Sequence, residues 1–140
     1  MKRLLFVAGV CTVLAGCATP VPMTSPVGGW LGTGIPGHPE ARFIRRFYAD
    51  GSTEIDYCLR HGKTLHVEYG HWAMGPLGAL TLVTDEVDGA KLTLQDTYDT
   101  SSYDGETWTI TLTASASAPD DVDNDFDLQR TNDAMSLTSC

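Results

Sequence analysis

The chain has 140 residues, of which 42% are hydrophobic and 19% charged, and its formal net charge at pH 7 is −9. This length fits one globular domain. The acidic balance, 18 Asp and Glu against 9 Lys and Arg, argues against nucleic acid as a partner and against electrostatic docking on anionic lipid.

The N-terminus has the order of features found in a secretory signal peptide. Lys2 and Arg3 precede an uncharged apolar run from Leu4 to Val13. Such a run is too short for a membrane-spanning helix, which needs about 20 residues, but it fits the apolar core of a signal peptide. The alternative is a short buried helix that belongs to the domain. The sequence therefore predicts a helical leader over residues 1–16, removed from the mature protein.

The four residues after Val13 are Leu14-Ala15-Gly16-Cys17, and they resemble the lipobox of bacterial lipoproteins. The resemblance implies transfer of diacylglycerol to the Cys17 thiol, cleavage before Cys17 and acylation of the new amine. Each buried methylene adds about 0.8 kcal/mol of membrane affinity, so three acyl chains make attachment effectively permanent. Ala18 stands where lipoproteins retained in the inner membrane carry Asp. The resemblance thus implies the periplasmic face of the outer membrane, with display on the cell surface left open.

The remaining cysteines predict a disulfide. Loss of the leader removes Cys11 and lipid occupies Cys17, which leaves Cys58 and Cys140. Two thiols in an oxidising compartment favour one bridge between them. The alternative is a free Cys140, or a bond from Cys140 to another chain.

The segment that follows Cys17 is rich in Pro, Gly, Ser and Thr, a composition that cannot bury enough apolar surface to order itself. We expect a flexible tether over residues 17–28 and a single domain over residues 29–140. Trp30 is expected to close one end of the core of that domain.

From Ala41 onward, apolar and polar residues alternate with period 2, and turn signals separate the runs. The expected inward-facing residues are Thr53, Ile55, Tyr57, Leu59, Leu65, Val67, Tyr69, Trp72, Met74, Leu80, Leu82, Leu92, Leu94, Trp108, Ile110, Leu112, Phe126 and Leu128. Gly70 is expected to bulge its strand and return Trp72 to the inner face. Cys58 falls on the outer face, where a C-terminal tail can reach it.

This pattern predicts about eight short strands in an all-β domain with one wet face. Consecutive hairpins in a chain of this size avoid exposed edges best by closing into a small antiparallel up-and-down β-barrel. A role in binding a protein partner would need an exposed loop, for which residues 96–105, rich in Tyr, Ser and Asp, are the candidate.

Part of the domain resembles the small bacterial lipocalin-like domains. The likeness rests on the runs Phe47-Tyr48-Ala49-Asp50-Gly51-Ser52, Glu68-Tyr69-Gly70-His71-Trp72 and Phe126-Asp127-Leu128-Gln129-Arg130, and on Tyr98. It implies an up-and-down barrel with a cavity for one small apolar ligand. The expected lining residues are Tyr57, Tyr69, Trp72 and Trp108.

A second likeness favours a protein partner. Tyr57-Cys58 and the run Gly62-Lys63-Thr64-Leu65-His66-Val67 resemble the opening of small periplasmic lysozyme-inhibitor lipoproteins. That resemblance implies recognition of a periplasmic protein through a loop such as residues 96–105. A purely structural role in the cell envelope is a further alternative.

No pattern predicts an enzyme, a metal site or a cofactor. The sequence has no Gly-x-Ser-x-Gly elbow, no Cys-x-x-Cys pair and no His-Glu-x-x-His. The alternating acids Asp121, Asp123, Asp125 and Asp127 lack the glycine of an EF-hand loop and are expected on a solvated face. We expect His38, His61, His66 and His71 on the surface, and Arg42, Arg45 and Arg46 on a strand face balanced by acids.

Overall fold

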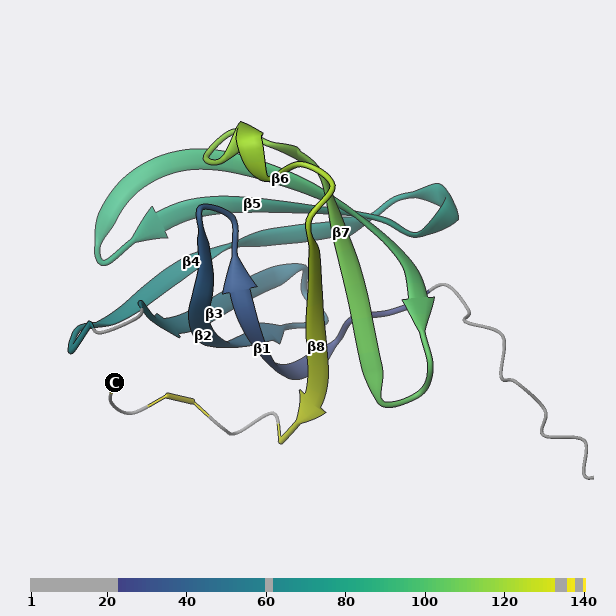
Figure 1. Cartoon of the computed structure of the whole chain (residues 1–140), viewed down its shortest axis with the longest axis horizontal. Coiled ribbons are helices and arrows are strands. Elements are labelled where there is room, and N and C mark those ends of the chain that lie inside the picture. Colours follow the sequence, from purple (N-terminus) through teal and green to yellow (C-terminus); the bar gives the residue numbers. More distant parts are fainter. Residues whose placement is uncertain (1–22, 60–61, 133–135, 138–139) are drawn as a thin grey trace, which may run out of the picture.

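A computed structural model describes residues 23–59, 62–132, 136–137 and 140 (Figure 1). The expected leader and Cys17 lie outside the described residues. The strands are β1 (Gly28–Ile35), β2 (His38–Phe47), β3 (Ser52–Cys58), β4 (Leu65–Met74), β5 (Ala79–Val87), β6 (Ala90–Tyr103), β7 (Thr107–Ser115) and β8 (Asp125–Thr131). Two short 3-10 turns, η1 (Pro76–Gly78) and η2 (Pro119–Asp121), lie between β4 and β5 and between β7 and β8. Within the described part of the chain, no helix has the length and apolarity needed to cross a membrane.

The eight strands close into an antiparallel barrel in sequence order. Each strand pairs with the next one along the chain, and β1 completes the ring by pairing with β8 from Gly29↔Thr131 to Gly32↔Leu128. Closure leaves no strand edge, as expected for a run of hairpins with one apolar face. The predicted all-β class and the eight-stranded barrel are confirmed.

Aromatic side chains fill one end of the barrel. Trp30 and Trp108 are both 0% exposed, and their ring centroids lie 4.9 Å apart. The ring centroid of Phe47 lies 5.9 Å from that of Trp108 and 5.9 Å from that of Trp72. The guanidinium of Arg130 covers the Trp30 ring at 4.3 Å and donates a hydrogen bond to the Val27 carbonyl. Trp30 therefore closes one end of the core, as predicted, and we call this end the closed end.

The packed domain includes residues that were expected in the tether. Met23 and Pro26 are buried. The Met23 backbone N–H donates to the Thr100 carbonyl at 3.3 Å, and the Pro26 carbonyl accepts from the Trp30 indole at 2.8 Å. The packing of the barrel therefore extends to the N-terminal side of residue 28, because the apolar Met23 side chain joins the barrel core at the closed end.

The predicted register of β4 is also wrong. The pairs Ile55↔Glu68 and Tyr57↔His66 place Glu68 and His66 on the inner face. Leu65, Val67 and Tyr69, which were expected to face inward, alternate with them and lie on the outer face. The inward positions of β4 continue without a break through Gly70 to Trp72. The pairing of β4 with β5 shifts by one residue, but the extra residue lies in β5, so Gly70 does not form the expected bulge.

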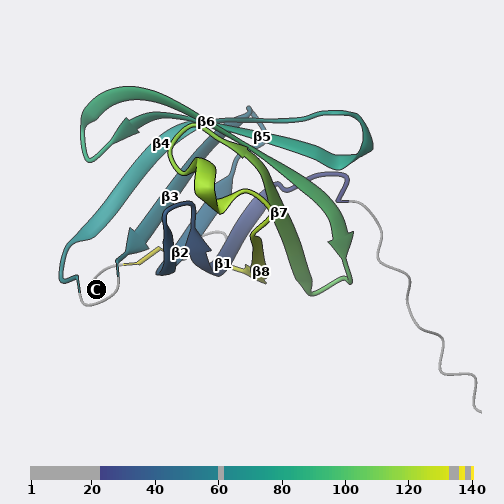
Figure 2. The ribbon, with the colours of Figure 1, turned by 45° about the horizontal axis from the view of Figure 1, so that its top comes forward.

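The segment 96–105 is not an exposed loop. β6 is the longest strand and curves around the barrel as far as Tyr103, pairing with β5 on one side and β7 on the other (Figures 1 and 2). Tyr98 is 4% exposed and Thr100 is 0% exposed. The polar composition of this segment was mistaken for a loop. Its inward residue Thr100 is accommodated inside the barrel, where its hydroxyl donates a hydrogen bond to the Gly78 carbonyl at 2.6 Å.

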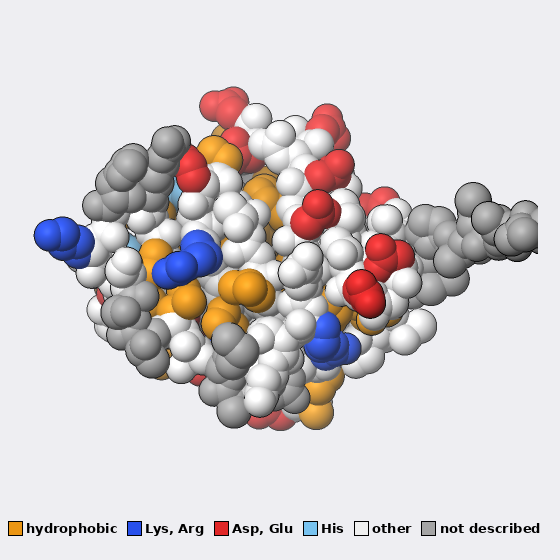
Figure 3. Space-filling model, turned by 60° about the horizontal axis from the view of Figure 1, so that its bottom comes forward, with side chains coloured by type: hydrophobic (Ala, Val, Ile, Leu, Met, Phe, Trp, Pro, Cys, Tyr) orange, Lys and Arg blue, Asp and Glu red, His pale blue; other side chains and the backbone are white. Residues whose placement is uncertain are grey.

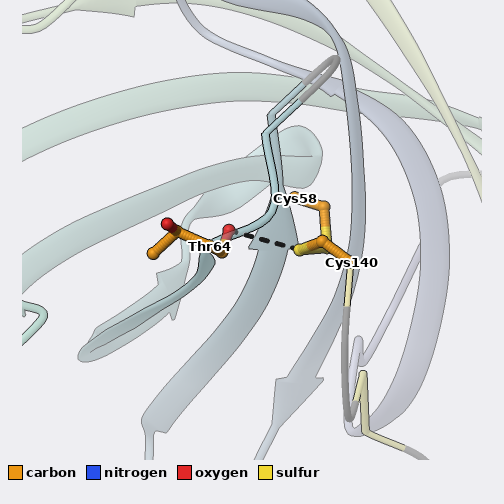
Figure 4. Close-up of a disulfide and its surroundings, with 3 residues drawn as sticks. All are labelled: Cys58, Thr64 and Cys140. Atoms are coloured by element: carbon orange, nitrogen blue, oxygen red, sulfur yellow. Dashed lines mark hydrogen bonds between the residues drawn. A yellow bond between two sulfur atoms is a disulfide. The ribbon is translucent and has the colours of Figure 1, made fainter.

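The disulfide prediction is confirmed. Cys58 and Cys140 are bonded, with Cα atoms 5.6 Å apart (Figure 4). Cys58 is the last residue of β3 and lies on its outer face, as the alternation predicted. The Cys140 sulfur also lies 3.2 Å from the Thr64 carbonyl oxygen, which is a close contact because a disulfide sulfur carries no hydrogen to donate.

Candidate binding site at the open end of the barrel

A cavity of about 230 Å³ opens at the end of the barrel opposite the aromatic cluster. Its apolar walls are Ile35, Pro36, Ile55, Leu82, Val87 and Leu94. Its polar walls are His38, Arg45, Tyr57, Glu68, Thr84, Asp96, Tyr98 and Ser117. The β1–β2 hairpin, the β5–β6 hairpin and the chain before η2 thus surround one opening, which we call the mouth.

Strand alternation brings the three charged side chains of the cavity inside. Arg45 lies between the inward residues Phe43 and Phe47 on β2, and its Nη1 lies 3.5 Å from the Thr53 hydroxyl. Glu68 of β4 accepts a hydrogen bond from the Thr84 hydroxyl at 3.2 Å.

Asp96 of β6 is the third charged residue, and it pairs across to Leu82 on β5. Its Oδ1 is buried and has no hydrogen-bond partner among the described residues. A buried polar atom without a partner costs free energy. The pocket therefore contains an acceptor that a suitable donor would stabilise.

Two tyrosines of the pocket are held in the neutral form. Burial raises the pKa of Tyr57, and the neighbouring Glu68 carboxylate raises it further. Burial likewise raises the pKa of Tyr98, with an added contribution from Asp96 that outweighs the opposite effect of Arg45. Both phenols consequently stay protonated, so each presents a neutral ring and a hydroxyl donor.

Hydrogen bonds between neighbouring loops shape the mouth. The His66 ring stacks on Tyr57 at 5.1 Å, and its Nδ1 lies 2.7 Å from an Asp88 carboxylate oxygen. The hydrogen bond with His66 and another from the Val67 N–H lower the pKa of Asp88. Across the mouth, the Gly37 N–H donates to Asp121, which joins the β1–β2 hairpin to η2 beside it (Figure 2).

The four residues expected to line a cavity are distributed over three environments. Tyr57 lines the pocket. Trp108 is enclosed in the aromatic cluster, and Trp72 packs against Phe47 with its indole donating to the Tyr48 carbonyl at 3.0 Å. Tyr69 is 48% exposed on the outer face, so its expected inward position is wrong.

The wall residues that sequence reasoning missed include Arg45, Glu68, Asp96 and Tyr98. Arg45 is two residues from both Phe43 and Phe47, so the period of a strand places all three on the same face. Asp96 alternates with Leu94 in the same way. A polar residue inside an inward-facing series was the available signal.

The three arginines of β2 do not form one cluster. Arg45 faces the pocket, whereas Arg46 lies on the outer face. There the Arg46 Nη2 atom lies 2.6 Å from a Glu54 carboxylate oxygen and 2.9 Å from an Asp56 carboxylate oxygen. Arg42 is exposed on the outer face. Balance by neighbouring acids is therefore confirmed for Arg46 alone.

A second depression, of about 470 Å³, lies on the outer surface where β1 and β8 diverge. Arg42 lies on one side of it, with Asp125 and Asp127 on the other. Both aspartates are exposed and accept hydrogen bonds from Thr111 and Thr109, as expected for a solvated face. Figure 3 shows acidic side chains along one side of this surface and a few separate Lys or Arg side chains. Hydrophobic side chains lie between the two groups.

Among the described residues, no three His, Cys, Asp or Glu side chains are grouped in a way that would hold a metal ion. His71 lies at the surface and contacts Asp85 at 2.8 Å, while His61 lies outside the described residues. Comparison of the chain with protein-family models, with curated proteins and with solved structures finds no match.

Proposed function

We propose that this protein is a non-catalytic binding protein that holds a small molecule in the pocket at the mouth of its barrel. The observation that carries the proposal is the contrast between the two ends. Large buried aromatic side chains occupy the closed end, whereas the mouth end retains a cavity with both apolar and charged walls. Such mixed walls are typical of sites that orient a ligand by a few polar groups.

The pocket favours a small ligand. Its volume of about 230 Å³ lies below the range of roughly 300–1,000 Å³ that is common for drug-sized ligands. The charged walls also change the expected chemistry, because a purely apolar ligand would leave Arg45, Glu68 and Asp96 desolvated without compensation. A short molecule with an apolar part and a polar group fits better.

The second part of the proposal is lipid attachment at Cys17 on the periplasmic face of the outer membrane. The lipobox-like run supports it, and the fold is compatible with it. Met23 packs at the closed end, and the six residues from Cys17 to Met23 reach at most about 20 Å when extended. An anchored barrel would therefore turn its closed end to the membrane and its mouth to the periplasm.

The test of the pocket uses two tryptophan substitutions on β6. Leu94 faces the cavity, whereas the adjacent Thr93 is exposed on the outer face. We expect fragments with an apolar part and a polar group to shift amide NMR signals of pocket residues in the wild-type mature chain and in Thr93→Trp. Leu94→Trp should abolish these shifts because the indole fills the cavity. Absence of any pocket shift in the wild type, or shifts that persist in Leu94→Trp, would contradict the proposal.

The test of the anchor is Cys17→Ser in the full-length chain. We expect the variant to be uncleaved or to fractionate as soluble protein, since serine cannot receive the thioether-linked lipid. The wild-type chain should appear in the membrane fraction with the mass of a lipidated product. Normal maturation and membrane fractionation of Cys17→Ser would show that the anchor proposal is wrong.

A further inference from the structure

We infer that the ligand of the mouth pocket is a small organic cation, an amine carried on a short apolar chain. This inference rests on the proposed binding function and specifies its substrate class. The first observation is the charge inside the cavity, where the carboxylates of Glu68 and Asp96 face the single guanidinium of Arg45. An excess of one negative charge in a partly desolvated site attracts one positive charge.

The partners of these groups show which of them remain available. Glu68 is engaged by the hydroxyl of Thr84 and interacts with Tyr57. Within the described part of the chain, Arg45 makes one side-chain hydrogen bond, from Nη1 to the Thr53 hydroxyl at 3.5 Å, and no ion pair within 4.0 Å. Asp96 has a buried Oδ1 that finds no hydrogen-bond partner in the part of the chain that the structure describes. An ammonium group donates up to three hydrogen bonds and accepts none, so it matches a pocket whose unpartnered atom is an acceptor.

The neutral parts of the wall suit the same ligand. Tyr57 and Tyr98 present uncharged aromatic rings to the cavity, and an ammonium over such a ring gains cation–π energy. Ile55, Leu82 and Leu94 provide the surface for an alkyl chain. A carboxylate ligand of the same length would instead meet two carboxylates for each guanidinium.

The surface around the mouth would also attract cations. The β5–β6 hairpin carries Glu86 and Asp88, and the chain at η2 carries Asp120, Asp121 and Asp123. Lys91 is opposed by Glu86 at 2.5 Å, and His66 by Asp88, so these basic groups are already matched. Clusters of one sign at the mouth of a cleft concentrate counter-ions and raise their rate of association.

The experiment compares three ligands of nearly equal size on the mature chain at pH 7, namely hexylamine, hexanol and hexanoate. Affinities come from titrations followed by amide NMR signals of the pocket. We expect protonated hexylamine to bind about tenfold more tightly than hexanol, and hexanoate to bind more weakly than hexanol. Added salt should lower the affinity for hexylamine more than the affinity for hexanol, because only hexylamine is attracted by charge.

A matched pair of variants assigns the effect to the pocket. Asp96→Asn should lower the affinity for hexylamine about fivefold or more, and by a larger factor than the affinity for hexanol, since the charge is removed while the shape of the side chain is kept. Asp125→Asn removes the same charge from the outer face of β8 and should change neither affinity. Amide NMR signals of the closed end report that the barrel of Asp96→Asn is intact.

The possible results separate the two proposals. Equal affinities for the three ligands, or tightest binding of hexanoate, would overturn the cation inference while a ligand-binding pocket remains. Equal losses of hexylamine affinity in Asp96→Asn and Asp125→Asn would also overturn the cation inference, because the attraction would then come from the overall charge of the protein. Failure of all three ligands to shift pocket signals, together with no effect of Leu94→Trp on any fragment, would contradict the proposed binding function itself.

Discussion

Gly70 shows how one residue fixes the geometry of the pocket wall. A Cβ atom at this position would lie 1.9 Å from the carbonyl oxygen of Val83 and 2.9 Å from its carbonyl carbon. The backbone of β5 passes this close because Asp85 is an extra residue in the β4–β5 pairing. Only glycine allows that approach. Glu68 and Trp72, on either side of Gly70, consequently both face inward.

We predict that Gly70→Ala lowers the free energy of unfolding by about 2–3 kcal/mol, because the methyl group must displace backbone atoms rather than a flexible side chain. Urea denaturation followed by tryptophan fluorescence measures the change. Gly75→Ala is the control, since its nearest neighbour would be the Ala79 carbonyl at 3.5 Å, an ordinary contact. Equal stabilities of the two variants would show that the close approach is absent.

At the scale of the elements, β2 and β3 are held together on their outer face by a buried charge cluster. Arg46 bonds Glu54 and Asp56 through Nη2, and Arg46 and Asp56 are almost fully buried. Burial acts to lower the pKa of Arg46, but its hydrogen bonds and attraction to Asp56 and Glu54 are stronger together and raise it. The guanidinium therefore stays charged and neutralises carboxylates that would otherwise be unpaired.

We predict that Arg46→Met destabilises the fold by about 3–5 kcal/mol, since it leaves Asp56 buried without its cation. The double variant Arg46→Met/Asp56→Leu should recover much of that loss, as the uncompensated charge is then removed. Arg42→Met, at an exposed position on the same strand, should change stability by less than about 0.5 kcal/mol. A small effect of Arg46→Met in urea denaturation would mean that water reaches the cluster.

At the scale of the whole molecule, the disulfide connects Cys140 to the last residue of β3. β8 ends at Thr131 beside β1, yet Cys140 is bonded to β3, two strands beyond β1 in the ring (Figure 1). The bond closes a loop with a sequence separation of 82 residues. It thereby restricts the unfolded chain far more than a local bridge would.

We predict that the double variant Cys58→Ser/Cys140→Ser loses about 4–5 kcal/mol of stability at most, the value expected from loop closure. Reduction of the wild-type protein with dithiothreitol should lower its urea midpoint to that of the double variant. The variant itself should be insensitive to the reductant. A wild-type midpoint that does not move on reduction would show that the bond does not stabilise the barrel.

The sequence by itself determined the strands and their closure, because both depend on local signals. Period-2 alternation and turns such as Asp50-Gly51 specify consecutive hairpins, and a small domain made of hairpins removes its edges by forming a barrel. The outward position of Cys58 followed from the same alternation. These features required no knowledge of which strands meet across the interior.

The tertiary structure alone decided where the interior is polar. The alternation in β4 favoured burial of Leu65, Val67 and Tyr69 over His66 and Glu68, and the structure buries the opposite face. Pairing with β3 settled the register, since Ile55 faces inward and places Glu68 beside it. Arg45, Glu68 and Asp96 come from three strands separated in sequence, so only closure of the barrel brings them together. Their charges are tolerated inside because they meet at the one end that the aromatic core does not fill.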